Sequence, residues 1–202
     1  MNNSIARTLS GAARSTIADP ELSCADRVAL LTLARRAIEA SLCGRSRPEL
    51  PEVRGAKLRR GAFVTLQALE THDLRGCIGR VRGDRPLGEV IRQVAVSAAR
   101  SDPRFPPVEP GELAGLRIEI SVLAEPVFTP TTELCHIVIG RDGLLVRRDK
   151  VQAVLLPQVA TENDMGPEAF LSAVCHKAGL EPGSWREPAT RVFTFTADVF
   201  VE

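Results

Sequence analysis

The stretch that decides the fold runs from Gly61 to Gly79 and reads Gly-Ala-Phe-Val-Thr-Leu-Gln-Ala-Leu-Glu-Thr-His-Asp-Leu-Arg-Gly-Cys-Ile-Gly. Its first half, Gly61–Leu69, is typical of a β-strand because it contains residues such as Phe63 and Val64. The polar residues 70–73 indicate a turn, after which Leu74–Gly79 returns as a second strand. The stretch therefore predicts a β-hairpin.

Helices are predicted on both sides of this hairpin. Ser23 caps a helix that carries an apolar stripe and ends at Gly44. Pro86 opens a second helix, and a third is expected over Pro167–Ala178. The segment Arg45–Arg60 has no periodicity and is predicted to be a surface loop. The buried face of the second helix is predicted to consist of Leu87, Val90, Ile91, Val94 and Ala98.

Further strands follow towards the C-terminus. Leu116–Leu123 alternates apolar and polar residues, as a half-buried strand does. Ile137–Val146 is predicted to be a hairpin that turns at an Asp-Gly pair, and Gln152–Leu156 a buried strand. Thr190–Val201 is expected to form one final strand. Since hairpins dominate, the predicted class is α+β, with a mostly antiparallel or mixed sheet flanked by helices.

Composition restricts the function classes. The chain has 202 residues, a net charge of +1, 44% hydrophobic residues and 4% aromatic residues, with no tyrosine. Such a length suits one large domain or two lobes sharing a core. The neutral charge and scarce aromatics make nucleic-acid binding unlikely. The sequence contains no apolar stretch of about eighteen residues, so a membrane span is not expected. Residues 1–22 have no apolar signal region and are predicted to be a flexible tail.

The cysteines indicate a reducing compartment. The five cysteines are an odd number, are widely spaced and form no Cys-x-x-Cys pair. That pattern predicts free thiols in a cytoplasmic protein. Two histidines directly follow a cysteine, in Cys135-His136 and Cys175-His176, and adjacent side chains point in different directions. Neither a metal site nor a cofactor site is predicted from these residues.

The segment Leu74–Gly79 contains the main candidate for chemistry, Cys77. Arg75 and Cys77 have the same strand parity, so both side chains are expected on one face, where the guanidinium would favour a thiolate. Gly76 and Gly79 leave room for a ligand or for another backbone. Cys77 is thus a candidate nucleophile or soft metal ligand. The alternative is a buried and inert strand cysteine.

Other polar residues are candidates for the same site. Asp102 and Arg104 lie in a proline-rich turn, where Arg104 could bind a carboxylate or phosphate, or where the two could pair structurally. Glu119 is either a buried acid lining a cleft or a solvated strand residue. Gln158, at the end of a strand, could offer a polar group to a pocket. Arginines at 80, 82 and 85 form a basic rim that has an ordinary explanation as solvated surface.

Five segments occur in the order that is typical of one known family, and the chain resembles the AMMECR domain from about Asp26 to Phe200. The resemblance implies a two-lobed α+β fold over residues 23–202, in which the second lobe is smaller. It also implies partners, namely a Memo-type protein and a radical SAM protein, in the bacterial AmmeMemoRadiSam system. It implies no established reaction. The five segments are Leu74–Gly79, Asp102–Phe105, Ile118–Leu123, Leu155–Val159 and Lys177–Leu180.

Two hypotheses about function remain open at this point. The first is an enzyme or enzyme subunit in which Cys77, Arg75 and Glu119 act at a cleft shared with Asp102 and Arg104. The second is a non-catalytic protein that docks on a partner through the surface of the Leu74–Gly79 segment. A concave site reaching the thiol favours the enzyme, and a flat apolar patch favours docking.

Overall fold

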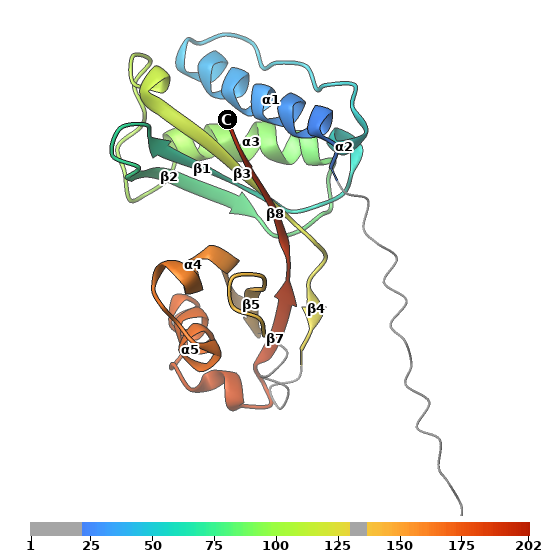
Figure 1. Ribbon diagram of the computed structural model, residues 1–202, viewed down its shortest axis with the longest axis vertical. Coiled ribbons are helices and arrows are strands. Elements are labelled where there is room, and N and C mark those ends of the chain that lie inside the picture. The colour runs from blue at the N-terminus through green and yellow to red at the C-terminus, as the bar shows by residue number, and fades with distance from the viewer. Residues whose placement is uncertain (1–21, 130–136) are drawn as a thin grey trace, which may run out of the picture.

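The computed structural model describes residues 22–129 and 137–202 and contains two antiparallel sheets, each flanked by helices (Figure 1). The predicted α+β class is confirmed. In chain order the elements are α1 (Cys24–Leu42), α2 (Arg54–Lys57), β1 (Ala62–Ala68), β2 (Leu74–Arg80), α3 (Leu87–Arg100), β3 (Leu116–Leu123), β4 (Val127–Phe128), β5 (Gly143–Arg148), β6 (Val151–Leu155), α4 (Pro157–Glu162), α5 (Pro167–Lys177), β7 (Arg191–Phe195) and β8 (Ala197–Val201).

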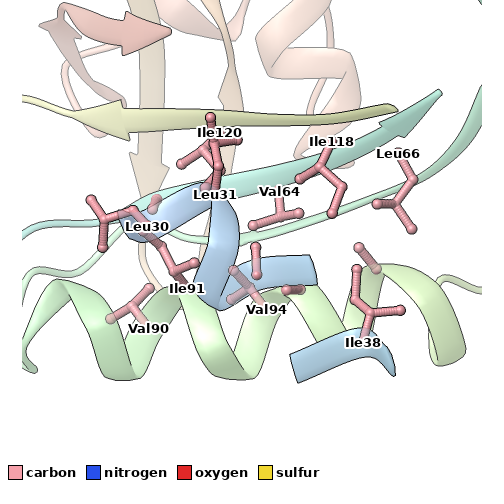
Figure 2. Packing of buried hydrophobic residues seen from close by; sticks show 14 of the residues in the cluster. Leu30, Leu31, Ile38, Val64, Leu66, Val90, Ile91, Val94, Ile118 and Ile120 are labelled. Carbon is pink, nitrogen blue, oxygen red and sulfur yellow. The ribbon is translucent and has the colours of Figure 1, made fainter. Parts of the chain in front are cut away.

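The first sheet has the strand order β2-β1-β3-β8, and α1 and α3 cover one of its faces. We call this sheet and its helices the first lobe. The predicted hairpin is present as β1 and β2, paired from Ala62 opposite Arg80. Leu30 and Ile38 of α1 pack against Val64 and Ile118 of the sheet, as Figure 2 shows. The expected buried face of α3 is confirmed, since all five of its residues are buried.

The start of α1 is fixed by the predicted cap. The Ser23 hydroxyl accepts from the Asp26 backbone N–H, while the Asp26 carboxylate accepts from Ser23, which is a capping box. Asp26 also accepts from the backbone of Gly55 at 2.6 Å, which ties α2 to α1. Helix α2 lies inside the segment that was predicted to be only loop. Leu22, the first described residue, is buried in the same core.

The second sheet has the strand order β4-β7-β5-β6, and we call it, with α4 and α5, the second lobe. Helix α5 lies where a helix was predicted, and Phe170, Leu171 and Val174 are fully buried on one face of the sheet. Gly179 follows the helix with a φ of 74°, a left-handed conformation that glycine adopts at little cost.

A third apolar cluster joins the two lobes. Leu123 of the first sheet meets Leu145 and Phe195 of the second, with Phe63 packed beside them. These residues lie on the faces that the helices leave open, so the open faces of the two sheets meet here. The chain also connects the lobes directly, because β7 in the second sheet runs into β8 in the first (Figure 1).

Two predictions of strands were wrong. The described residues from Ile137 onward do not form a hairpin strand, because the Asp142 carboxylate accepts from the backbone of Val138 and closes a local turn. The hairpin is instead β5–β6, which turns at Asp149 with a φ of 52°. The expected final strand is two strands in different sheets, interrupted at Thr196. Within residues 22–129 and 137–202, no helix is long and apolar enough to cross a membrane.

Candidate functional site

The register of the first sheet brings Cys77, Thr65 and Glu119 into one row across three strands. Cys77 is opposite Thr65, and Thr65 is opposite Glu119. Adjacent strands lie about 4.8 Å apart, so the row spans about 10 Å from Cys77 to Glu119. A Cβ placed at Gly76 would point towards α3. Side chains alternate along a strand, so the side chain of the next residue, Cys77, points the other way, towards the second lobe. We call these three residues the Cys77 row.

The half-buried thiol of Cys77 accepts a hydrogen bond from the Thr65 hydroxyl, with 3.4 Å between oxygen and sulfur. Two cations lie close enough to interact with the sulfur electrostatically. Asp102 raises the pKa of Arg104, and Cys77 acts in the same direction. Burial lowers the pKa of the Lys177 ammonium, while Cys77 opposes this shift and Arg104 adds to it. Lys177 is exposed as a residue, and it is partial burial of its ammonium group that lowers the pKa.

Arg75 has a different set of partners from the expected one. Its Nε donates to the Glu112 carboxylate at 2.5 Å, and a second nitrogen donates to the Pro106 carbonyl at 2.9 Å. The hydrogen bond from Arg75 lowers the pKa of Glu112. Arg75 thus fastens the proline-rich loop to β2, and the positive charges beside the thiol come from Arg104 and Lys177.

Asp102 and Arg104 pair with each other, and together they bind the backbone of Cys77. The buried Asp102 carboxylate accepts from the Cys77 N–H at 2.8 Å and from Arg104 Nε at 2.9 Å. Arg104 in turn donates to the Cys77 carbonyl at 3.3 Å. These hydrogen bonds, led by that from Arg104, hold the pKa of Asp102 well below its usual range. The turn therefore positions the thiol in addition to placing a cation beside it.

The two glycines of the segment allow close packing around Cys77. A Cβ at Gly76 would lie 2.2 Å from the backbone oxygen of Ala98 in α3. A Cβ at Gly79 would lie 2.1 Å from the ring of Phe63. Gly76 lets α3 approach the strand, and Gly79 accommodates the ring that borders the contact between the lobes.

Glu119 lies opposite α4 of the second lobe, which Figure 1 shows next to the first sheet. Gln158 donates to a Glu119 carboxylate oxygen at 3.5 Å. Burial raises the pKa of Glu119, Arg117 opposes the shift and Glu162 adds to it. Gln158 lies in the first turn of α4, one residue after Pro157, and not at the end of a strand as predicted. The residue still reaches the predicted site, because α4 turns it towards the first sheet.

Comparison with known proteins identifies the family. The model of the AMMECR1 family matches residues 31–200. The chain belongs to the AMMECR1 family. A Methanothermobacter thermautotrophicus relative is 44% identical over 86% of this chain and 92% of its own length, and a Thermococcus kodakarensis relative is 42% identical over 86% and 88%. The crystal structure of an uncharacterised Pyrococcus horikoshii protein is similar at a TM-score of 0.81, with 40% identity over 86% of this chain and 89% of the other.

In this member of the AMMECR1 family, the sequence patterns did not predict that Thr65 and Lys177 belong to the site. Thr65 was one residue of an ordinary strand, and only the register of the sheet places it between Cys77 and Glu119. Lys177 lies 100 positions after Cys77 and was noted in the sequence only as the first residue of the family segment Lys177–Leu180, with no role at the thiol. Both residues join the site only through contacts in the folded structure, and the patterns of a single sequence do not reveal such contacts.

The described residues of this AMMECR1-family chain contain no cluster of three or more His, Cys, Asp or Glu side chains that could hold a metal ion. Cys24, Cys43, Cys77 and Cys175 are free thiols. Cys135 and His136 lie outside the described residues. The groups assembled around Cys77 are thus a thiol, a hydroxyl, two cations and a carboxyl with a raised pKa.

Proposed function

We propose that this AMMECR1-family protein is a thiol-dependent component, catalytic or accessory, of a cytoplasmic system that includes a Memo-type and a radical SAM protein. One observation carries the proposal. The Thr65 hydroxyl donates to the Cys77 sulfur, while Arg104 and Lys177 interact with that sulfur electrostatically. Positive charges beside a cysteine are typical of reactive thiols. The two partner proteins follow from the family resemblance alone.

The chemistry proposed for this site is attack by the Cys77 thiolate on an electrophilic carbon of a small substrate. The sulfur forms a bond to that carbon, and the displaced electron pair moves to an oxygen of the substrate. Glu119 supplies a proton to that oxygen, because burial raises its pKa and so favours the protonated carboxyl.

The proposed substrate class is anionic. Arg104 uses part of its guanidinium on Asp102 and on the Cys77 carbonyl, but its side chain is 53% exposed. The ammonium of Lys177, at the end of α5 in the second lobe, interacts electrostatically with both Cys77 and Arg104. A carboxylate or phosphate bound between these two cations would bring the electrophilic carbon close to the thiol.

A non-catalytic docking function is the second candidate, and one feature favours it. Val199 and Val201 of β8 are 43% and 44% exposed and lie opposite Ser121 and Glu119. They belong to the same sheet face as the Cys77 row, at its free edge. A partner protein that covers these valines would gain apolar burial and an edge strand for pairing.

Two matched variants distinguish these functions in cells that lack the gene. Under the thiol proposal, Cys77→Ser abolishes function while the purified protein keeps its unfolding midpoint, and Val201→Thr supports normal function. Under the docking alternative, Val201→Thr abolishes function and Cys77→Ser supports normal function. Restoration of function by Cys77→Ser would refute the thiol proposal.

A further inference from the structure

A basic pocket lies between the lobes, separated from the Cys77 row by Phe63 and the third apolar cluster. Its volume is about 620 Å³, within the range of small-molecule sites. Arginines reach it from both lobes: Arg82 follows β2 in the first lobe, and Arg147 lies on β5 in the second. Arg59 and Arg60, just before β1, also line it. Of the three arginines that form the basic rim in the sequence, Arg82 therefore lines a cavity.

Two of these cations, Arg82 and Arg147, come one from each lobe and are exposed. Neither Arg82 nor Arg147 has a hydrogen-bond or ion-pair partner in the described part of the chain. Arg147 lies over the ring of Phe193 at 5.4 Å from the ring centre, and Arg191 lies over the same ring at 5.3 Å. Arg147 and Arg191 are directly opposite each other in the sheet, an arrangement of like charges that lowers stability.

The acidic residues of the pocket do not balance this charge. Asp84 and Glu125 line the pocket together with Arg59, Arg82 and Arg147, and with Arg60, which has an interaction of its own. The Asp84 carboxylate is already bound by Arg80, which lies outside the lining. An anion between the lobes would thus meet a surplus of positive charge.

The rest of the pocket wall is apolar. Val81, Leu123, Leu145 and the ring of Phe193 line it, and all four belong to or pack against the cluster that joins the lobes. A ligand made only of charged groups would leave this wall in contact with water. A ligand with an apolar body would bury it, and a flat ring would pack against Phe193.

We propose that this pocket binds a small molecule that carries a phosphate or carboxylate group on an apolar, ring-containing body. Arg82 and Arg147 bind the anionic group from the two lobes, and the apolar wall receives the body. A second basic pocket, of about 580 Å³ between α1 and α3, differs in its wall, because its apolar lining is limited to Ala37, Ala40, Pro48 and Val96 and includes no aromatic ring. The proposal does not depend on any reaction at Cys77.

Calorimetric titration of the full chain with phenyl phosphate tests the proposal. We expect saturable binding, weaker binding of inorganic phosphate or phenol alone, and a decline in affinity with added salt. Arg82→Gln and Arg147→Gln should each weaken the binding of phenyl phosphate about tenfold or more. Both side chains are exposed, so the variants should fold, which their unfolding curves will verify. Arg148→Gln is the matched control, one position along β5 on the other face, and should bind within about twofold of the unchanged protein.

Two results would overturn the proposal. One is the absence of saturable binding of phenyl phosphate to the unchanged, folded protein. The other is an affinity for phenyl phosphate that is the same in Arg82→Gln, Arg147→Gln and the control Arg148→Gln. The anion would then be held elsewhere.

Discussion

The carboxylate of Asp102 accepts a hydrogen bond of 2.8 Å from the backbone N–H of Cys77. Strand β2 is an edge strand, so on this side no neighbouring strand can bind that N–H. Arg104 binds the Cys77 carbonyl from the same side and is itself bound to Asp102. The pair thus occupies the position of a neighbouring strand for one residue. It fixes the backbone of Cys77 and protects this part of the edge from pairing with other chains.

Asp102→Asn tests this arrangement through stability. We expect the variant to lose about 1–3 kcal/mol of unfolding free energy near pH 7. The substitution replaces a buried carboxylate, which accepts several hydrogen bonds, by a neutral amide that accepts fewer and weaker ones. The folded-state pKa of Asp102 is lowered, so its contribution is present above the unfolded pKa and is lost as pH falls. The difference from the unchanged protein should therefore shrink below about pH 4. Urea denaturation at several pH values measures it.

The control for this prediction is Asp84→Asn, which breaks a surface pair with Arg80 whose side chains are 49% and 35% exposed. Solvent screens such a pair, and the variant should unfold with an unchanged midpoint. Equal stability of Asp102→Asn and Asp84→Asn near neutral pH would show that Asp102 does not hold the edge of β2.

Gly76→Ala should be strongly destabilising. The added Cβ would lie 2.2 Å from the Ala98 backbone oxygen, so α3 and β2 must move apart at a cost of about 1–3 kcal/mol or more. Gly115→Ala is the matched control, since its Cβ would meet no atom within 4 Å. Thermal unfolding of both variants compares them. A Gly76→Ala protein as stable as Gly115→Ala would contradict the packing described for this glycine.

Glu119→Gln should change the pH dependence of stability in the opposite sense to Asp102→Asn. Burial raises the folded-state pKa of Glu119, so the folded protein holds its proton more tightly than the unfolded chain does. Stability is then lost as pH rises from the unfolded pKa, about 4.3, through the folded one. The difference in unfolding free energy between the variant and the unchanged protein should therefore move in favour of the variant as the pH rises from acidic to neutral. A constant difference across this range in urea denaturation would show that Glu119 does not titrate as described.

The parts of the fold that sequence predicted best are governed by local patterns. The β1–β2 hairpin, the Ser23 cap and the buried face of α3 follow from alternation, capping chemistry and helical periodicity, which act within a few residues. The predicted turn at Asp142 was wrong for a related reason. The turn lies at residues 139–141, where the Asp142 carboxylate accepts from the Val138 backbone, and Gly143 already begins β5, so the strands pair around Asp149 instead.

The candidate site was only partly predictable, because its members come together through long-range contacts. Cys77, Asp102 and Arg104 were chosen from short sequence segments, and the structure brings them into contact. Lys177 reaches the same place only because the second lobe packs against the open face of the first sheet. That packing depends on apolar residues scattered over several strands of both sheets, and no local pattern in the sequence indicates it.

The measurement that tests the central claim most directly is the rate at which iodoacetamide alkylates Cys77, resolved by peptide mass spectrometry. The protein for this assay carries Cys24→Ser and Cys43→Ser, since both residues are exposed. Cys175 serves as the internal reference because it is fully buried and burial raises the pKa of its thiol.

We expect Cys77 to react at least about tenfold faster than Cys175, because its half-buried sulfur lies beside two cations. Lys177→Met should slow Cys77 several-fold, whereas Lys150→Met, at an exposed turn, should leave the rate unchanged. If Cys77 reacts as slowly as Cys175 and is insensitive to Lys177→Met, it is a structural strand cysteine and not a functional thiol.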